Sequence, residues 1–171
     1  MRILRWIVPT LVAVAALLLV PGWAFASTVS TDQVNGLEYS ATSTVGKFAG
    51  TATGDLPGAF TATVAHAPLD PRPGMSVPIT GGSFTLYSRR IITGSFSGGA
   101  VTLLASPSNC RDETYEVTGT LNGLNTGGSG DVTVILTHLR RQLGAQCLTY
   151  GARVAGSLNI ALPGPDGPGS P

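Results

Sequence analysis

Histidine is the scarcest side chain in this chain that could carry acid–base chemistry, because only His66 and His138 occur. Each follows a stretch with apolar residues at every second position, residues 60–64 and 132–136, so both imidazoles are predicted to point to the inner face of a sheet. Two imidazoles in one cavity could act as a general base or bind a metal. The predicted strands run in opposite directions, however, so we favour a strand-end His66 and a hydrogen-bonded core His138.

Two further side chains complete the set of candidates for a site inside the fold. Tyr115 lies on an apolar strand face, and Arg153 interrupts an otherwise apolar final strand, where it could meet a ligand carboxylate. We favour an outward-facing Arg153. Glu113 and Glu116 point to opposite faces of a regular strand and so form no paired acid/base site, and a solvated strand entrance explains them better. The candidate lumen residues are therefore His138, Tyr115 and Arg153.

Sequence motifs of the common enzyme classes are missing. The chain has no GxSxG nucleophile elbow, no Walker A sequence, no HExxH pair and no GxGxxG strand–helix junction. Neither cysteine has a CxxC partner or a histidine at ligand spacing. The sequence therefore predicts no cofactor and no metal site, and it assigns no catalytic residue beyond the lumen candidates.

The elements that must position these residues are short strands. Gly-rich or Pro-rich breaks recur every eight to twelve residues between runs of Thr, Val, Phe, Tyr and Ile, a pattern typical of an all-β sandwich or barrel. We predict a single antiparallel meander barrel of eight or nine strands, with a β-sandwich as the alternative. The predicted strands cover residues 36–43, 45–53, 58–66, 77–87, 90–97, 99–104, 113–122, 131–142 and 147–161.

Alternation within these strands predicts which side chains form the core. Tyr115, Val117 and Leu121 share one face, against polar residues on the other. The same parity places four phenylalanines inward, and turns are predicted at residues 55–58, at Gly98-Gly99 and over residues 122–130. The inward phenylalanines are Phe48, Phe60, Phe84 and Phe96.

The two cysteines, Cys110 and Cys147, allow one intramolecular pair, and we expect a disulfide. For a separation of this length the chain-entropy model gives a stabilisation of roughly 4 kcal/mol. In an up-and-down meander both cysteines lie in connections at the same end, because one whole hairpin separates them. The pairing therefore favours the barrel, although a Greek-key crossing could also bring the cysteines together.

The N-terminal residues 1–26 are predicted to be a secretory signal peptide. Arg2 and Arg5 precede an apolar run, and Ala24-Phe25-Ala26 is a small-x-small cleavage site, so the mature chain should begin at Ser27. An uncleaved membrane anchor is the alternative. We expect a secreted, extracellular β-domain over residues 27–161 and a disordered Pro/Gly-rich tail over residues 162–171.

Removal of the signal peptide changes the composition of the chain. It leaves eight basic and nine acidic residues, with Lys47 as the only lysine and no tryptophan. Nucleic acid and acidic lipid are therefore not expected as partners, and no membrane association is expected after cleavage. The mature surface should be dominated by Thr, Ser and Gly rather than by charge.

The number and spacing of the predicted strands resemble those of lipocalin-like, avidin-like and allene-oxide-cyclase-like barrels over most of the mature chain. The Gly-x-Trp of lipocalins and the tryptophans of avidin-like sites are missing, so the resemblance is one of architecture and assigns no family. We expect a non-catalytic binding or structural module with an envelope or extracellular partner. The alternative is a small barrel enzyme or carrier of an apolar small molecule, which requires a lumen of several hundred Å³ rather than one filled by phenylalanines.

Overall fold

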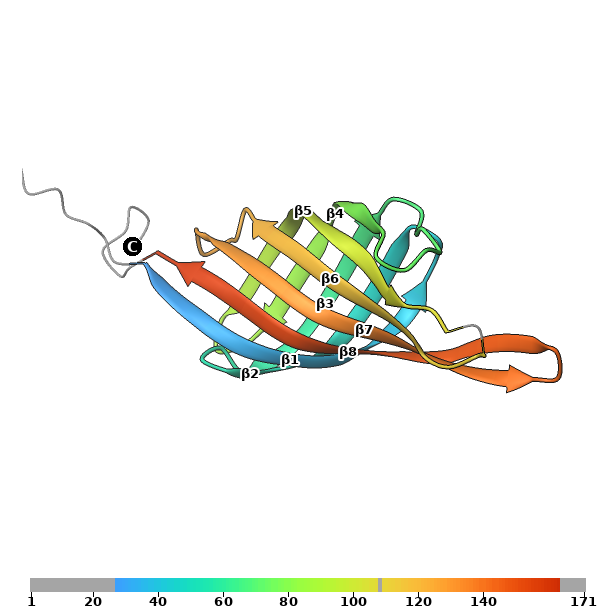
Figure 1. Cartoon of the computed structure of the whole chain (residues 1–171). Coiled ribbons are helices and arrows are strands. Elements are labelled where there is room, and N and C mark those ends of the chain that lie inside the picture. The colour runs from blue at the N-terminus through green and yellow to red at the C-terminus, as the bar shows by residue number, and fades with distance from the viewer. Residues whose placement is uncertain (1–26, 108, 164–171) are drawn as a thin grey trace, which may run out of the picture.

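The computed structural model describes residues 27–107 and 109–163, and these residues form a closed antiparallel barrel of eight strands (Figure 1). Each strand pairs with its neighbour along the chain, and the first pairs with the last, so the predicted meander barrel is confirmed. The strands are β1 (Thr28–Ala41), β2 (Val45–Gly54), β3 (Gly58–His66), β4 (Ser76–Tyr87), β5 (Ile91–Ala105), β6 (Glu113–Asn122), β7 (Ser129–Leu143) and β8 (Gln146–Leu162).

The barrel interior is an apolar core built by alternation. Along β6 every second residue from Tyr115 to Leu121 is buried, as the sequence predicted. The four phenylalanines are also buried in this core, and the rings of Phe60 and Phe84 stack with centroids 6.5 Å apart. Closing the sheet on itself gives every strand two neighbours over most of its length and buries one face of each strand.

Two strands differ from the prediction by more than one or two residues at an end. β1 begins at Thr28 rather than at residue 36, because its inward positions Ser30 and Asp32 are polar and hide the alternation. β5 is one strand where two had been predicted, since Gly98 and Gly99 form no turn and pair with β6, after a bulge at Ser97. At Gly99 φ is +127°, and an added Cβ would lie 2.0 Å from the Thr118 carbonyl oxygen, so glycine lets the neighbouring strand approach closely.

The barrel has two different ends. At the turn end lie the connections β2–β3, β4–β5 and β6–β7, together with the beginning of β1 and the end of β8. At the hairpin end lie the other four connections, and there β7 and β8 continue beyond the barrel as a projecting hairpin, the spur (residues 139–151) (Figure 1). The spur turns at Gly144, where φ is +62°.

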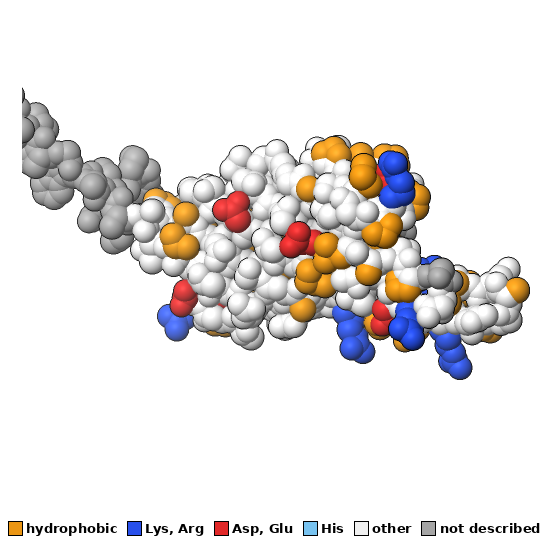
Figure 2. All heavy atoms as spheres, in the orientation of Figure 1, with side chains coloured by type: hydrophobic (Ala, Val, Ile, Leu, Met, Phe, Trp, Pro, Cys, Tyr) orange, Lys and Arg blue, Asp and Glu red, His pale blue; other side chains and the backbone are white. Residues whose placement is uncertain are grey.

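The predicted disulfide is present at the hairpin end. Cys110 in the β5–β6 connection is bonded to Cys147 in the spur, with their Cα atoms 5.5 Å apart and a sequence separation of 37. Few charged side chains lie on the face seen in Figure 2, which agrees with the expected polar, weakly charged surface. The described residues contain no helix long and apolar enough to cross a membrane.

Two predictions fall mainly outside the described residues. The signal peptide over residues 1–26 lies entirely outside them, and so do residues 164–171 of the predicted tail. The described part shows that β8 continues to Leu162, one residue into the segment predicted as tail.

Candidate functional site

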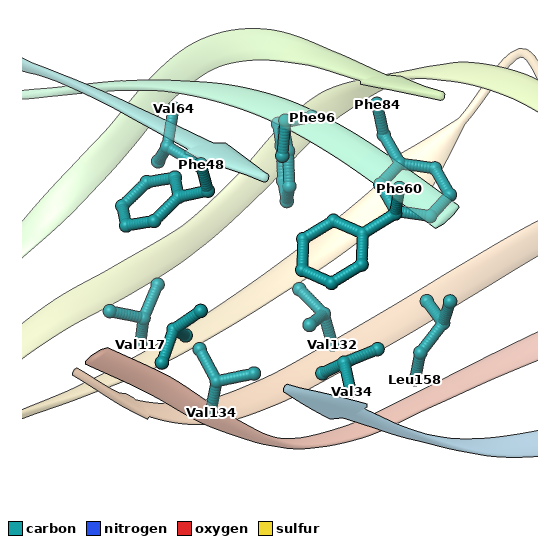
Figure 3. Close-up of a pocket in the computed structure, with 12 residues that line it drawn as sticks. Val34, Phe48, Phe60, Val64, Phe84, Phe96, Val117, Val132, Val134 and Leu158 are labelled. Carbon is teal, nitrogen blue, oxygen red and sulfur yellow. The ribbon is translucent and has the colours of Figure 1, made fainter. Parts of the chain in front are cut away.

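The middle of the lumen is packed with side chains. Figure 3 shows phenylalanine rings from β2, β3, β4 and β5 facing aliphatic side chains from β1, β6, β7 and β8. They leave a cavity of about 50 Å³ with no polar lining atoms. Small-molecule sites measure roughly 300–1,000 Å³, so this cavity is too small to enclose a typical ligand.

A second cavity of about 50 Å³ lies at the hairpin end of the lumen, and we call it the mouth cavity. It shares Phe48, Val64 and Val117 with the central cavity, so the two are neighbours along the barrel. Its lining is chemically different, because four elements contribute groups that can exchange protons. These are Glu38 from β1, His66 from β3, Tyr115 from β6 and His138 from β7.

His138 lies between two carboxylates. Its Nε2 is 3.1 Å from Glu38 Oε2, and its Nδ1 is 3.8 Å from Glu113 Oε2. The side chains of His138 and Glu38 are 18% and 8% exposed, so this pair is largely withdrawn from water. A carboxylate can only accept, so the neutral ring donates its Nε2 proton to Glu38, while the protonated ring can donate toward both carboxylates. His138 is therefore hydrogen-bonded, as predicted, but it lines the mouth cavity instead of lying in the buried core.

Glu113 connects this pair to the rim of the barrel. Ser106 Oγ donates to Glu113 Oε1 at 2.7 Å, and Arg140 Nη1 lies 3.6 Å from the same oxygen. Glu113 and Arg140 are each about one-fifth exposed, which corrects the expectation that Glu113 lies at a solvated strand entrance. Glu113 of β6 is paired with His138 of β7, so both side chains point to the inner face of the barrel.

Tyr115 packs against the imidazole of His138, with ring centroids 5.2 Å apart. Burial of the phenol raises the pKa of Tyr115 well above its ordinary value, and the nearby Glu113 carboxylate raises that pKa further. Tyr115 is therefore a neutral hydrogen-bond donor over the physiological pH range.

His66 lines the same cavity as His138, which corrects the expectation that the two histidines lie in oppositely directed strands. The cause is β5: once it is a single strand, β3 and β7 run in the same direction. The contact between His66 Nδ1 and the Ala67 carbonyl oxygen measures 2.7 Å. A carbonyl cannot donate, so Nδ1 carries the proton and the Nε2 of a neutral His66 is an acceptor.

Of the three lumen candidates, the structure brings Tyr115 and His138 together and separates Arg153 from them. Arg153 is exposed on the outer face of β8, between Leu37 of β1 and Thr137 of β7. Its outward position agrees with the orientation we favoured and removes it from the lumen. Within residues 27–107 and 109–163, no three His, Cys, Asp or Glu side chains are placed to hold one metal ion.

Glu38 is the cavity-lining ionisable residue that sequence analysis missed. Its position is four residues after the inward-facing Val34, so both side chains point to the inner face of β1. The alternation of β1 shows this once the strand is taken to begin at Thr28. The mouth cluster (Glu38, Glu113, Tyr115, His138 and Arg140) can orient a proton on an imidazole and offer a neutral phenol beside it.

Comparisons with protein-family models, with curated proteins and with solved structures find no match to this chain.

Proposed function

We propose that this protein is a secreted, non-catalytic binding module of the cell exterior, which meets its partner through its outer surface. The signal-like residues 1–26 support export, and the Cys110–Cys147 disulfide is of the kind that persists in oxidising compartments. The packed lumen is the observation that carries this proposal. Four phenylalanines fill the barrel, and each of the two cavities measures only about 50 Å³.

Native mass spectrometry of the protein purified from its own host tests this proposal. We expect the mass of the chain beginning at Ser27, alone or with a macromolecular partner, and no retained small molecule. A variant that fills the central cavity, Ala62→Val, should keep any macromolecular partner, because Ala62 lines that cavity. A small molecule that is retained by the wild type and lost from Ala62→Val would overturn the proposal in favour of a carrier.

A second candidate function rests on the mouth cluster. The 3.1 Å contact of His138 with Glu38 and the adjacent Tyr115 could support proton transfer on a substrate that reaches the mouth of the barrel. The two candidates differ in what His138→Gln does. The binding module keeps its partner in this variant, whereas an enzyme loses turnover in His138→Gln and retains a native fold by circular dichroism.

A further inference from the structure

The β8 strand has an unpaired edge in the spur. β8 pairs with β7 from Gln146 onward, but its pairing with β1 begins only at Arg153, opposite Leu37. Residues 146–152 therefore have a strand on one side only within the part of the chain that the structure describes. Figure 1 shows the spur projecting clear of the barrel, so the barrel itself does not cover this edge.

The opposite edge of the spur is protected. The Arg140 backbone N–H on β7 donates to Asp112 Oδ1 at 3.1 Å. The Cys110–Cys147 disulfide holds the β5–β6 connection, which carries Asp112, against the spur. The two edges of the same hairpin thus differ, because one is capped by a side chain and a covalent tie and the other presents free backbone groups.

The composition of the free edge favours pairing. Sheet edges are usually protected from further strands by charged residues, prolines or bulges. Residues 146–152 contain no charge and no proline, although the β7–β8 register shifts so that Tyr150 is a bulge residue. The two large apolar side chains of this edge, Leu148 and Tyr150, are 45% and 69% exposed. The edge is therefore uncharged and open to hydrogen bonding on either side of the bulge.

We propose that this edge joins two copies of the chain, with β8 pairing antiparallel to β8 of the second copy about a two-fold axis at Thr149. In that register Leu148 lies opposite the bulge residue Tyr150 of the other copy, so an aliphatic and an aromatic side chain meet twice. Residue 146 of one copy faces residue 152 of the other. The contact therefore ends where the hairpin turn of one copy reaches the point at which β1 of the other copy begins to pair with its own β8. The edge is complementary to itself in length and in charge.

The nearest charged side chains also fit a second copy. Arg141 lies on β7, paired with Leu148, and is therefore one strand farther from the two-fold axis. Arg153 lies just beyond the contact, where Leu37 of its own β1 already occupies the β8 edge. No like charges therefore face each other across the interface. The two-fold axis also fixes the register between two copies, which nothing would fix for an unrelated strand. The inference is independent of what the mouth of the barrel binds.

Sedimentation velocity of the full mature chain over a range of concentrations, combined with amide hydrogen exchange, tests this proposal. We expect a monomer–dimer equilibrium in which exchange at residues 146–152 slows as concentration rises. A chain that stays monomeric at all concentrations would overturn the proposal, and so would a dimer whose added protection lies elsewhere. If the edge instead pairs with a foreign peptide or binds a lipid surface, the purified chain would stay monomeric at all concentrations, which overturns the proposal.

Leu148→Glu is the decisive variant. A glutamate there faces Arg141 within its own hairpin, so the monomer should fold normally. We expect dimerisation to weaken by about 100-fold, since each copy loses one buried leucine worth at least tenfold. Leu104→Glu on β5 is the matched control, because Leu104 is 46% exposed and lies away from the edge, and it should dimerise like the wild type.

A second edge variant keeps the test decisive if Leu148→Glu does not fold. Tyr150→Lys places a charge at the most exposed edge position and should also abolish dimerisation. A dimer of unchanged affinity in either folded edge variant, or loss of the dimer in Leu104→Glu, would contradict the proposal.

Discussion

The two ends of this barrel are stabilised in different ways. At the turn end the strands meet in close apolar packing: of the large side chains with almost no exposure, all except Leu103 lie toward this end. Two carboxylates also tie β1 to the β2–β3 turn. Asp32 Oδ1 accepts from the Leu56 N–H at 2.8 Å, and Asp55 Oδ2 accepts from the Thr31 N–H at 2.9 Å.

The hairpin end has a different construction. The Cys110–Cys147 disulfide and the cluster around His138 connect its strands, and its spur leaves a strand edge exposed. The comparison teaches that the closest apolar packing and the ionisable cluster of the lumen are separated along the barrel axis. A packed end can hold the sheet closed while the other end carries ionisable groups and free backbone, which cost stability where they are buried or unpaired.

The disulfide should give the largest single effect. Replacing both Cys110 and Cys147 with serine should lower the free energy of unfolding by about 4 kcal/mol, because the unfolded chain regains the entropy of an open loop. Urea denaturation measures the loss, and amide chemical shifts should change at the hairpin end while those of the turn end stay in place. Shifts that spread equally over both ends would contradict the division between them.

Packing at the two ends can be compared with the same substitution on neighbouring strands. Leu121→Ala at the turn end should cost about 3–4 kcal/mol, since a fully buried leucine leaves a cavity. Leu136→Ala should cost nearer 2 kcal/mol, because Leu136 already lines the mouth cavity. Urea denaturation of both variants measures the difference, and an equal or reversed order would show that the ends are packed alike.

The carboxylate ties at the turn end should have a smaller effect. Asp32→Ala leaves the Leu56 N–H without its acceptor and should cost about 1–3 kcal/mol in urea denaturation. Asp55→Ala is the matched control, because its hydrogen bond to Thr31 is exposed and should be worth less than about 1 kcal/mol. If Asp55→Ala were the more damaging variant, burial would not be the reason that Asp32 matters.

Alkaline titration should give the smallest effect, and only at the hairpin end. Because its pKa is raised by folding, the Tyr115 phenol stays protonated in the folded protein at a pH where it has lost its proton in the unfolded chain. The free energy of unfolding therefore falls as pH rises above about 10. The slope is at most about 1.4 kcal/mol per pH unit. Tyr115→Phe should remove this slope in urea denaturation across that range, whereas Tyr150→Phe should retain it because Tyr150 is exposed.

Sequence reasoning predicted the barrel because alternation is a local property that each strand displays by itself. It failed where a strand broke that pattern: Ser30 and Asp32 are polar but buried, and Gly98-Gly99 resembles a turn but continues β5 after a bulge. The second error mattered more, because a single extra strand reverses the direction of every strand that follows. It separated His66 from His138, which line one cavity.

By itself, the sequence determined the meander, the inward phenylalanines and the Cys110–Cys147 pair, because periodicity and a count of two cysteines leave few alternatives. Only the tertiary structure decided that Glu38 and Glu113 converge on His138 and that β8 separates from β1 at Arg153. These features depend on the register of strands that are distant in sequence. Such a register is fixed when the barrel closes, and no local pattern records it.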